Sequence, residues 1–375
     1  MHIVAFLADL KRYRDRALAW QRAAAQVGSM TLLTLHDPGD LTLPGVRIEV
    51  LGEGLRGVAA RLALLRWWQR NRHPVDLLHD TQGFMLPLFA RVGRRGPVRL
   101  TSAFATSFDW FHQFRGAHPV EWRVREVRNY TYLALEWALA RVSDAFTVFG
   151  EGHIAPSARA WQVPPDRIFS IPNCVDPQGF SPEGPVGETG FAPGDPVLLF
   201  VGQVFRYKGV YELLDALAAL RPELPRLRLL MVGDVPPGAE VRAHIERLGV
   251  GEHVLLPGPV GRAALPGLMR AASVVVLPSY TEGSPRVLIE AMACGRPIVG
   301  TDLPGIAALD PEGGSIPLVP RGDAAALASA LRGLLMHPEG AQLAGQRNRA
   351  RYLAHHTPDA AGDVLADVYR RLARR

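Results

Sequence analysis

Cysteine and lysine are scarce in this sequence. Its 375 residues contain two cysteines, Cys174 and Cys294, without C-x-x-C spacing, and two lysines, Lys11 and Lys208, among 42 basic residues. So few cysteines argue against a disulfide framework and indicate a reducing, cytoplasmic setting.

Long hydrophobic runs are absent as well. The apolar runs at residues 197–201 and 274–277 are far shorter than the ~20 residues that a membrane-spanning helix needs. Residues 1–9 have no basic lead-in and end in charge, which is typical of a first β-strand rather than of a signal peptide. We therefore expect a cytoplasmic protein and leave open a peripheral association with the cytoplasmic face of the inner membrane.

Common metal and cofactor motifs are also missing, since there is no D-x-D, no H-E-x-x-H and no Walker A loop. The formal charge of +6 would suit a phosphate-bearing partner, but arginine, alanine, proline and glycine are abundant throughout, so compositional bias explains the charge better. No nucleic-acid-binding motif occurs. We expect no metal, no cofactor and no nucleic acid.

Apolar strand-like runs alternate with helix-like segments along the chain, a pattern typical of βαβ units with parallel sheets. A Pro- and Gly-rich stretch at residues 173–195 is interpreted as a linker between two domains, 1–172 and 196–355. Residues 356–375 are expected to form a helix that packs back on the first domain. The predicted strands cover residues 2–7, 30–35, 47–51, 76–79, 98–101, 145–149 and 167–171, then 196–202, 227–232, 253–256, 273–277, 298–301 and 316–319.

The most informative segment runs from Glu282 to Glu290, directly after a predicted strand. Open α/β sheets bind ligands at the carboxyl ends of their strands. Ser284 is a good N-cap and Pro285 a good first helical residue, so a helix N-terminus that attracts phosphate is expected here. Glu290 can accept hydrogen bonds from a ribose and Glu282 from a hexose, whereas solvated surface charges would be the uninteresting alternative.

A second loop, from Gly202 to Gly209, also connects a strand to a helix. Lys208 lies at the start of that helix, and in so arginine-rich a chain a lysine there favours a compact ammonium group that binds phosphate. A surface lysine without function is the alternative.

Together these segments resemble the family-4 retaining glycosyltransferases with the GT-B fold, also called glycosyl transferases group 1, and the resemblance spans most of the chain. The motifs that carry it occur in the expected order at residues 143–149, 171–180, 200–209, 282–290, 291–305 and 318–323. The resemblance implies an α/β fold with two Rossmann-like doubly wound domains facing across a cleft, followed by C-terminal helices.

The resemblance further implies a metal-independent hexosyltransferase that uses a UDP- or GDP-sugar and retains the anomeric configuration. The acceptor would be a glycan, a glycolipid or a small aglycone, with a role in cell-envelope polysaccharide or lipid glycosylation. The implied catalytic residues are Glu282, Lys208 and Arg206, and the implied donor-binding residues are Gly202, Gln203, Gly283, Ser284, Pro285, Arg286, Val287 and Glu290.

Several positions depart from the family pattern. Gln203 stands where relatives commonly have arginine, and Arg206 is the candidate to replace it. Residues 8–14 lack the Gly-Gly turn that many relatives carry, and Ala103 stands where relatives often have histidine. A catalytically impaired GT-B binding subunit therefore remains an alternative. The acceptor-side candidates are Asp9 and, in an aromatic segment, Phe104, Trp110 and His112; ordinary packing of a long loop is an equal explanation for that segment.

A further alternative comes from residues 52–57, a literal G-x-G-x-x-G with Asp76 about 20 residues later, as in dinucleotide-dependent oxidoreductases. The pattern is short, glycine is frequent in the chain, and the motif does not follow the first strand. It favours an oxidoreductase only weakly.

Overall fold

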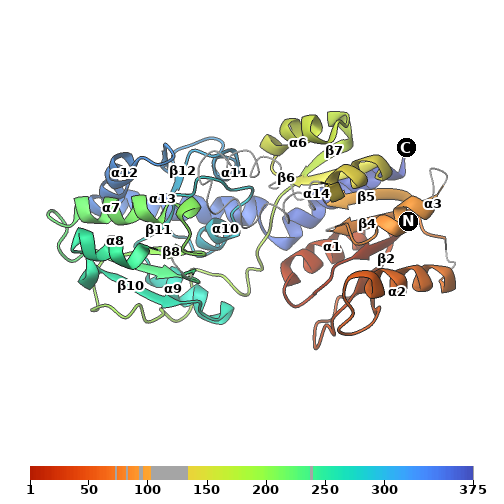
Figure 1. Cartoon of the computed structure of the whole chain (residues 1–375), viewed down its shortest axis with the longest axis horizontal. Coiled ribbons are helices and arrows are strands. Elements are labelled where there is room, and N and C mark those ends of the chain that lie inside the picture. The colour runs from red at the N-terminus through yellow and green to blue at the C-terminus, as the bar shows by residue number, and fades with distance from the viewer. Residues whose placement is uncertain (72–73, 82, 93–95, 103–133, 237–239, 375) are drawn as a thin grey trace. The chain divides into compact units, whose positions relative to one another are not determined.

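The computed structural model describes residues 1–71, 74–81, 83–92, 96–102, 134–236 and 240–374. The chain divides into two compact units, each built on a parallel sheet with helices packed against it (Figure 1). Among the described residues, every strand pairing is parallel. The expected class of two doubly wound α/β domains is confirmed.

The first unit contains residues 1–109, 124–174 and 357–375, as far as they are described. Its seven-stranded sheet has the order β3-β2-β1-β4-β5-β6-β7, so the winding direction changes between β1 and β4. The strands are β1 (His2–Phe6), β2 (Ser29–Thr34), β3 (Val46–Val50), β4 (Leu77–Thr81), β5 (Val98–Ser102), β6 (Ala145–Phe149) and β7 (Ile168–Ile171), and the helices are α1 (Arg14–Val27), α2 (Gly57–Arg70), α3 (Leu86–Val92), α6 (Ile154–Trp161) and α14 (Pro358–Ala373).

The second unit contains residues 175–356. Its six-stranded sheet has the order β10-β9-β8-β11-β12-β13, with the change of direction between β8 and β11. The strands are β8 (Val197–Val201), β9 (Arg228–Val232), β10 (Val254–Gly258), β11 (Val274–Leu277), β12 (Ile298–Thr301) and β13 (Leu318–Val319), and the helices are α7 (Val210–Leu220), α8 (Val241–Leu248), α9 (Leu265–Ala271), α10 (Arg286–Ala293), α11 (Pro304–Ala307), α12 (Ala324–Met336) and α13 (Pro338–His355).

All thirteen predicted strands are confirmed, with ends shifted by at most two residues. The start of α10 differs from the prediction. Pro285, not Ser284, is the N-cap, and Arg286 is the first helical residue. Pro285 has an extended ψ of 105°, and its carbonyl oxygen accepts the Ile289 N–H at 3.4 Å, so the helical hydrogen bonds begin one residue later than expected.

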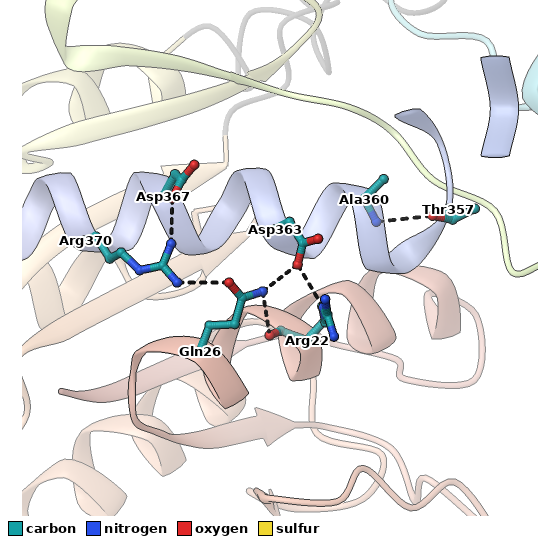
Figure 2. Close-up of polar contacts among 7 residues, drawn as sticks. All are labelled: Arg22, Gln26, Thr357, Ala360, Asp363, Asp367 and Arg370. Carbon is teal, nitrogen blue, oxygen red and sulfur yellow. Dashed lines mark hydrogen bonds and ion pairs between the residues drawn. The ribbon is translucent and has the colours of Figure 1, made fainter. Parts of the chain in front are cut away.

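The C-terminal helix α14 lies against α1 within the first unit (Figure 2). Thr357 caps it by accepting the Ala360 N–H at 3.1 Å, and Asp363 accepts hydrogen bonds from Arg22 and Gln26 of α1. Gly362 allows a close approach, because a Cβ there would lie 2.6 Å from the carbonyl oxygen of Ala19. The apolar side of α14, including Leu365, Tyr369 and Leu372, joins the core that also contains Trp20 of α1.

No helix in the described part of the chain is long and apolar enough to cross a membrane.

Candidate active site

Two loops meet at the point where the second sheet changes its winding direction. The loop of residues 202–209 follows β8, and the loop of residues 278–285 follows β11, its neighbour in the sheet. Ligands of open α/β sheets bind at such a switch point, outside the carboxyl ends of the strands. The two segments that the sequence singled out are therefore brought to one location in the second unit.

The two loops are fastened to each other through the backbone. Tyr280 donates its N–H to the carbonyl oxygen of Tyr207 at 2.8 Å. Gly209 has a φ of 70°, in the left-handed region, and a Cβ there would lie 1.9 Å from the carbonyl oxygen of Pro278. Glycine is therefore required at this contact, since a larger residue would separate the loops.

Lys208 and Glu282 form an ion pair across this junction, with 2.6 Å between Nζ and Oε1. Ser279 donates its hydroxyl to the same carboxylate oxygen at 2.8 Å. Burial alone would lower the pKa of Lys208, but the carboxylate of Glu282 and the nearby Tyr207 together outweigh burial and raise that pKa. Lys208 is therefore cationic at neutral pH, in a place where 20% of its side chain is exposed.

The backbone of Glu282 and Gly283 is held from the other side by α11. Gly305, in that short helix, packs so closely that a Cβ would lie 2.0 Å from the carbonyl oxygen of Gly283. Thr301, at the end of β12, donates its hydroxyl to the carbonyl oxygen of Ser279 at 2.6 Å. The loop that presents Glu282 is thus fixed by neighbouring elements on both sides.

Glu290 lies in α10 and is 4% exposed, so it is not a solvated helix charge. Its Oε1 contacts Arg262 at 3.0 Å and Arg286 at 3.3 Å. Burial raises the pKa of Glu290, although both arginines act in the opposite direction. A buried carboxylate that holds two arginines is a second charged centre on the helix whose N-terminus lies at the same switch point.

The remaining predicted donor residues lie on the same loops with different surroundings. Arg206 is exposed and stacks over the ring of Tyr211 at 4.3 Å, and Gln203 is exposed. Gly283 and Pro285 are buried, whereas Gly202, Ser284 and Val287 are partly exposed. No hydrogen bond between either Gln203 or Arg206 and the Glu282 carboxylate occurs in the described part of the chain.

Sequence reasoning missed three contributors to this site: Arg262, Ser279 and Thr301. Ser279 and Thr301 could have been found, because each lies at a strand end beside the Glu282 loop. Arg262 follows β10 without any motif, and no sequence signal connects it with Glu290.

The acceptor-side candidates belong to the first unit or lie outside the described residues. Asp9 follows β1, and its carboxylate accepts the Arg12 N–H at 3.0 Å, which shapes the turn before α1. Phe104, Trp110 and His112, like Ala103, lie outside the described residues.

The dinucleotide alternative does not fit the first sheet. Residues 52–57 follow β3, the edge strand, two strands away from the switch point. Asp76 precedes β4 and accepts the His2 N–H at 2.6 Å, so it lies at the amino ends of the strands. A dinucleotide fingerprint needs its glycines and its acidic residue at the carboxyl ends.

The two doubly wound domains and the strand-end loops of the second unit define a protein of the GT-B class. Residues 195–337 match the model of the family Glycosyl transferases group 1. The predicted resemblance to this family is confirmed, and the matched residues lie in the second unit.

Curated relatives show the same resemblance, and solved structures share the fold. A D-inositol 3-phosphate glycosyltransferase of Jonesia denitrificans is 34% identical over 38% of this chain and 37% of its own. Another, from Xylanimonas cellulosilytica, is 32% identical over 64% of this chain and 60% of its own. These alignments span about a third to three fifths of the relatives' length. The structure of Anabaena HepE with UDP and glucose superposes with a TM-score of 0.72 at 18% identity, over 99% of this chain and all of the other, which shows the shared fold.

Proposed function

We propose that the chain is a retaining glycosyltransferase that transfers a hexose from a UDP- or GDP-sugar to an acceptor hydroxyl. The observation that carries this proposal is the junction of the loops after β8 and β11, where Lys208 pairs with Glu282 beside the N-terminus of α10. A nucleoside diphosphate needs cationic and N–H groups for its phosphates and an acceptor group for its ribose, and this junction offers both.

The proposed roles follow from charge and position. Lys208 and the first N–H groups of α10 bind the diphosphate, while Glu290 accepts hydrogen bonds from the ribose hydroxyls. Glu282 then changes partner: the diphosphate competes for Lys208, and the carboxylate becomes available to the hexose hydroxyls. The ion pair between Lys208 and Glu282 is thus the form of the site without donor, and it keeps both groups charged and positioned.

The proposed reaction breaks the bond between the anomeric carbon and the β-phosphate oxygen and forms a bond to the acceptor oxygen on the same face. The acceptor proton passes to the departing phosphate oxygen. Negative charge grows on the diphosphate as the bond breaks, so fixed cationic and N–H groups at that position lower the barrier. Because protein groups supply this positive charge, we propose that the reaction needs no metal and no cofactor.

A thermal-shift screen of nucleotides and nucleotide sugars tests donor binding. A bound diphosphate at 100 times its Kd is expected to stabilise the protein by about 2.7 kcal/mol. Lys208→Met should weaken this binding by at least about tenfold, because a charge-assisted contact is worth roughly 1.5–3 kcal/mol. Lys11→Met is the matched control, because it removes the other lysine from the other unit and should leave the affinity unchanged.

Transfer itself is tested with the donor that the screen identifies. Nuclear magnetic resonance of the product should show the anomeric configuration of the donor, and excess EDTA should leave the rate unchanged. An inverted product or a loss of rate with EDTA would refute the corresponding part of the proposal. Nucleotide binding without any transfer or donor hydrolysis would favour the impaired binding subunit.

We also propose that the acceptor belongs to cell-envelope glycan or lipid synthesis and is met at the cytoplasmic membrane face. The support is the basic segment that leads into α1, in which Lys11, Arg12 and Arg14 are exposed. The protein should co-sediment with vesicles of phosphatidylglycerol and should not co-sediment with vesicles of phosphatidylcholine.

A further inference from the structure

The first sheet has its own switch point, between β1 and β4, and α1 begins beside it. Arg16 lies in the first turn of α1. Its guanidinium lies 5.8 Å from the ring centre of Tyr13, which precedes the helix, and 5.1 Å from that of Phe149, at the carboxyl end of β6. Arg16 is therefore placed at the carboxyl edge of this sheet, near two aromatic rings from different segments.

Arg16 has no acidic partner among the residues that the structure describes. In the described part of the chain no carboxylate forms an ion pair or hydrogen bond with it, and the groups that influence its charge are Cys174 and Tyr13. The side chain is largely enclosed by protein but retains some solvent access. Burial lowers the pKa of Arg16, which reflects an enclosed cation without a counterion.

This placement is unfavourable for stability in three respects. A buried charge normally requires an opposite charge. A cation in the first turn of a helix lies at the positive end of the helix dipole. Burial lowers the pKa of His79, within β4, to about 3, and the Arg16 cation contributes to this shift because it opposes protonation of the imidazole. Contact with two aromatic rings offsets part of this cost.

Three carboxyl groups of the described residues near this edge have other roles. Asp9 accepts the Arg12 N–H, and buried Asp15 has bonding partners of its own. Asp80, at the end of β4, is fully buried, and its pKa of about 8, raised by burial, keeps it mostly protonated at pH 7. None of these three carboxyl groups pairs with Arg16, and exposed Lys11 and Arg12 lie beside it in the sequence.

We propose that Arg16 binds a phosphate group of the acceptor at the switch point of the first unit. This inference rests on the proposed function, and it narrows the acceptor to a phosphorylated compound. A phosphate supplies the missing counterion, receives two N–H groups from the planar guanidinium and also favours the helix N-terminus. The phosphate can be carried by a soluble polyol or sugar phosphate or by a lipid headgroup, because both present the same chemistry.

The test compares four forms of the full chain: wild type, Arg16→Gln, Arg16→Lys and Arg141→Gln. Arg141 is the matched control. Its guanidinium contacts the ring of Trp137 at 3.4 Å, but it precedes β6 and so lies at the opposite edge of the sheet. Titration calorimetry at pH 7 uses inorganic phosphate and glycerol 3-phosphate, and sedimentation uses vesicles of phosphatidylglycerol or of phosphatidylcholine.

Wild type and Arg141→Gln should bind phosphate equally. Arg16→Gln should bind it roughly 10- to 100-fold more weakly, and Arg16→Lys should lie between them, because lysine keeps the charge but not the two-pronged geometry. In phosphate-free buffer the melting temperature of Arg16→Gln should be no lower than that of wild type. If the affinity for glycerol 3-phosphate differs between wild type and the Arg16 variants, the phosphate is carried by a soluble acceptor. If only the binding to phosphatidylglycerol vesicles differs, the phosphate is carried by a lipid.

The inference is overturned if no probe distinguishes Arg16→Gln and Arg16→Lys from wild type, or if Arg141→Gln loses binding to the same extent. Titration with UDP in the same samples separates this outcome from a failure of the proposed function. Normal UDP binding with no effect of Arg16 refutes the phosphate site alone. Absence of nucleotide binding with an intact effect of Arg16 refutes the donor proposal alone.

Discussion

Gly305 offers the sharpest test of how the donor loop is held. A Cβ at this position would lie 2.0 Å from the carbonyl oxygen of Gly283 and 2.9 Å from that of Glu282. An ordinary contact needs more than 3.4 Å, so Gly305→Ala must move α11 or the loop by about 1 Å or more. Both contact atoms belong to the backbone and cannot rotate away, as a side chain could.

The expected loss of stability is about 1–3 kcal/mol, as for other overpacked sites. The transfer rate is expected to fall by up to about 100-fold, because a displacement of about 1 Å at the Glu282 loop disturbs the alignment of Glu282 with Lys208. Thermal unfolding measures the first quantity. Steady-state kinetics with the donor identified by the thermal-shift screen measures the second.

Gly333→Ala is the control for this experiment. Gly333 lies inside α12, and a Cβ there would meet no atom within 4 Å. Alanine should therefore stabilise the helix by up to about 1 kcal/mol and leave the kinetics unchanged. If Gly305→Ala unfolded at the wild-type temperature and kept its rate, the loop would not be held by α11 and the reasoning would be refuted.

Three further predictions concern the first unit. Tyr369→Phe removes the hydroxyl that contacts His79 Nδ1 at 2.7 Å and should cost about 1–3 kcal/mol, measured by urea unfolding, because a buried polar atom loses its partner; an unchanged midpoint would contradict this. Gly362→Val should destabilise by a similar amount, because its Cβ would lie 2.6 Å from the Ala19 carbonyl oxygen, and the shift in melting temperature checks it. The pKa of Asp80 is raised to about 8, so its contribution to stability is present at low pH and is lost as the pH rises from about 4 to 8. The pKa of His79 is lowered to about 3, so its contribution is lost as the pH falls below about 6.5. Asp80→Asn should therefore abolish the decline between about pH 6.5 and 8 and reveal a rise between about pH 4 and 6.5; a profile that matches wild type would contradict the assigned pKa.

The parallel sheets were predictable because buried parallel strands form apolar runs that need no distant context. The end of β4 shows where this signal stops. The strand was predicted to end at His79 but continues to Thr81, and Asp80 pairs in register with Thr101 of β5. Polar residues at the carboxyl end of a strand interrupt the apolar pattern without interrupting the sheet.

The sequence by itself determined the fold class, the strands and the two loops that carry Lys208 and Glu282. Hydrophobic periodicity and the position of a residue at a strand end depend only on neighbouring residues in the chain. Tertiary structure decided which charges meet. It paired Lys208 with Glu282, brought Arg262 to Glu290, and placed Arg16 near Tyr13 and Phe149. These contacts depend on strand order and on burial across distant segments, and no spacing within the chain encodes them.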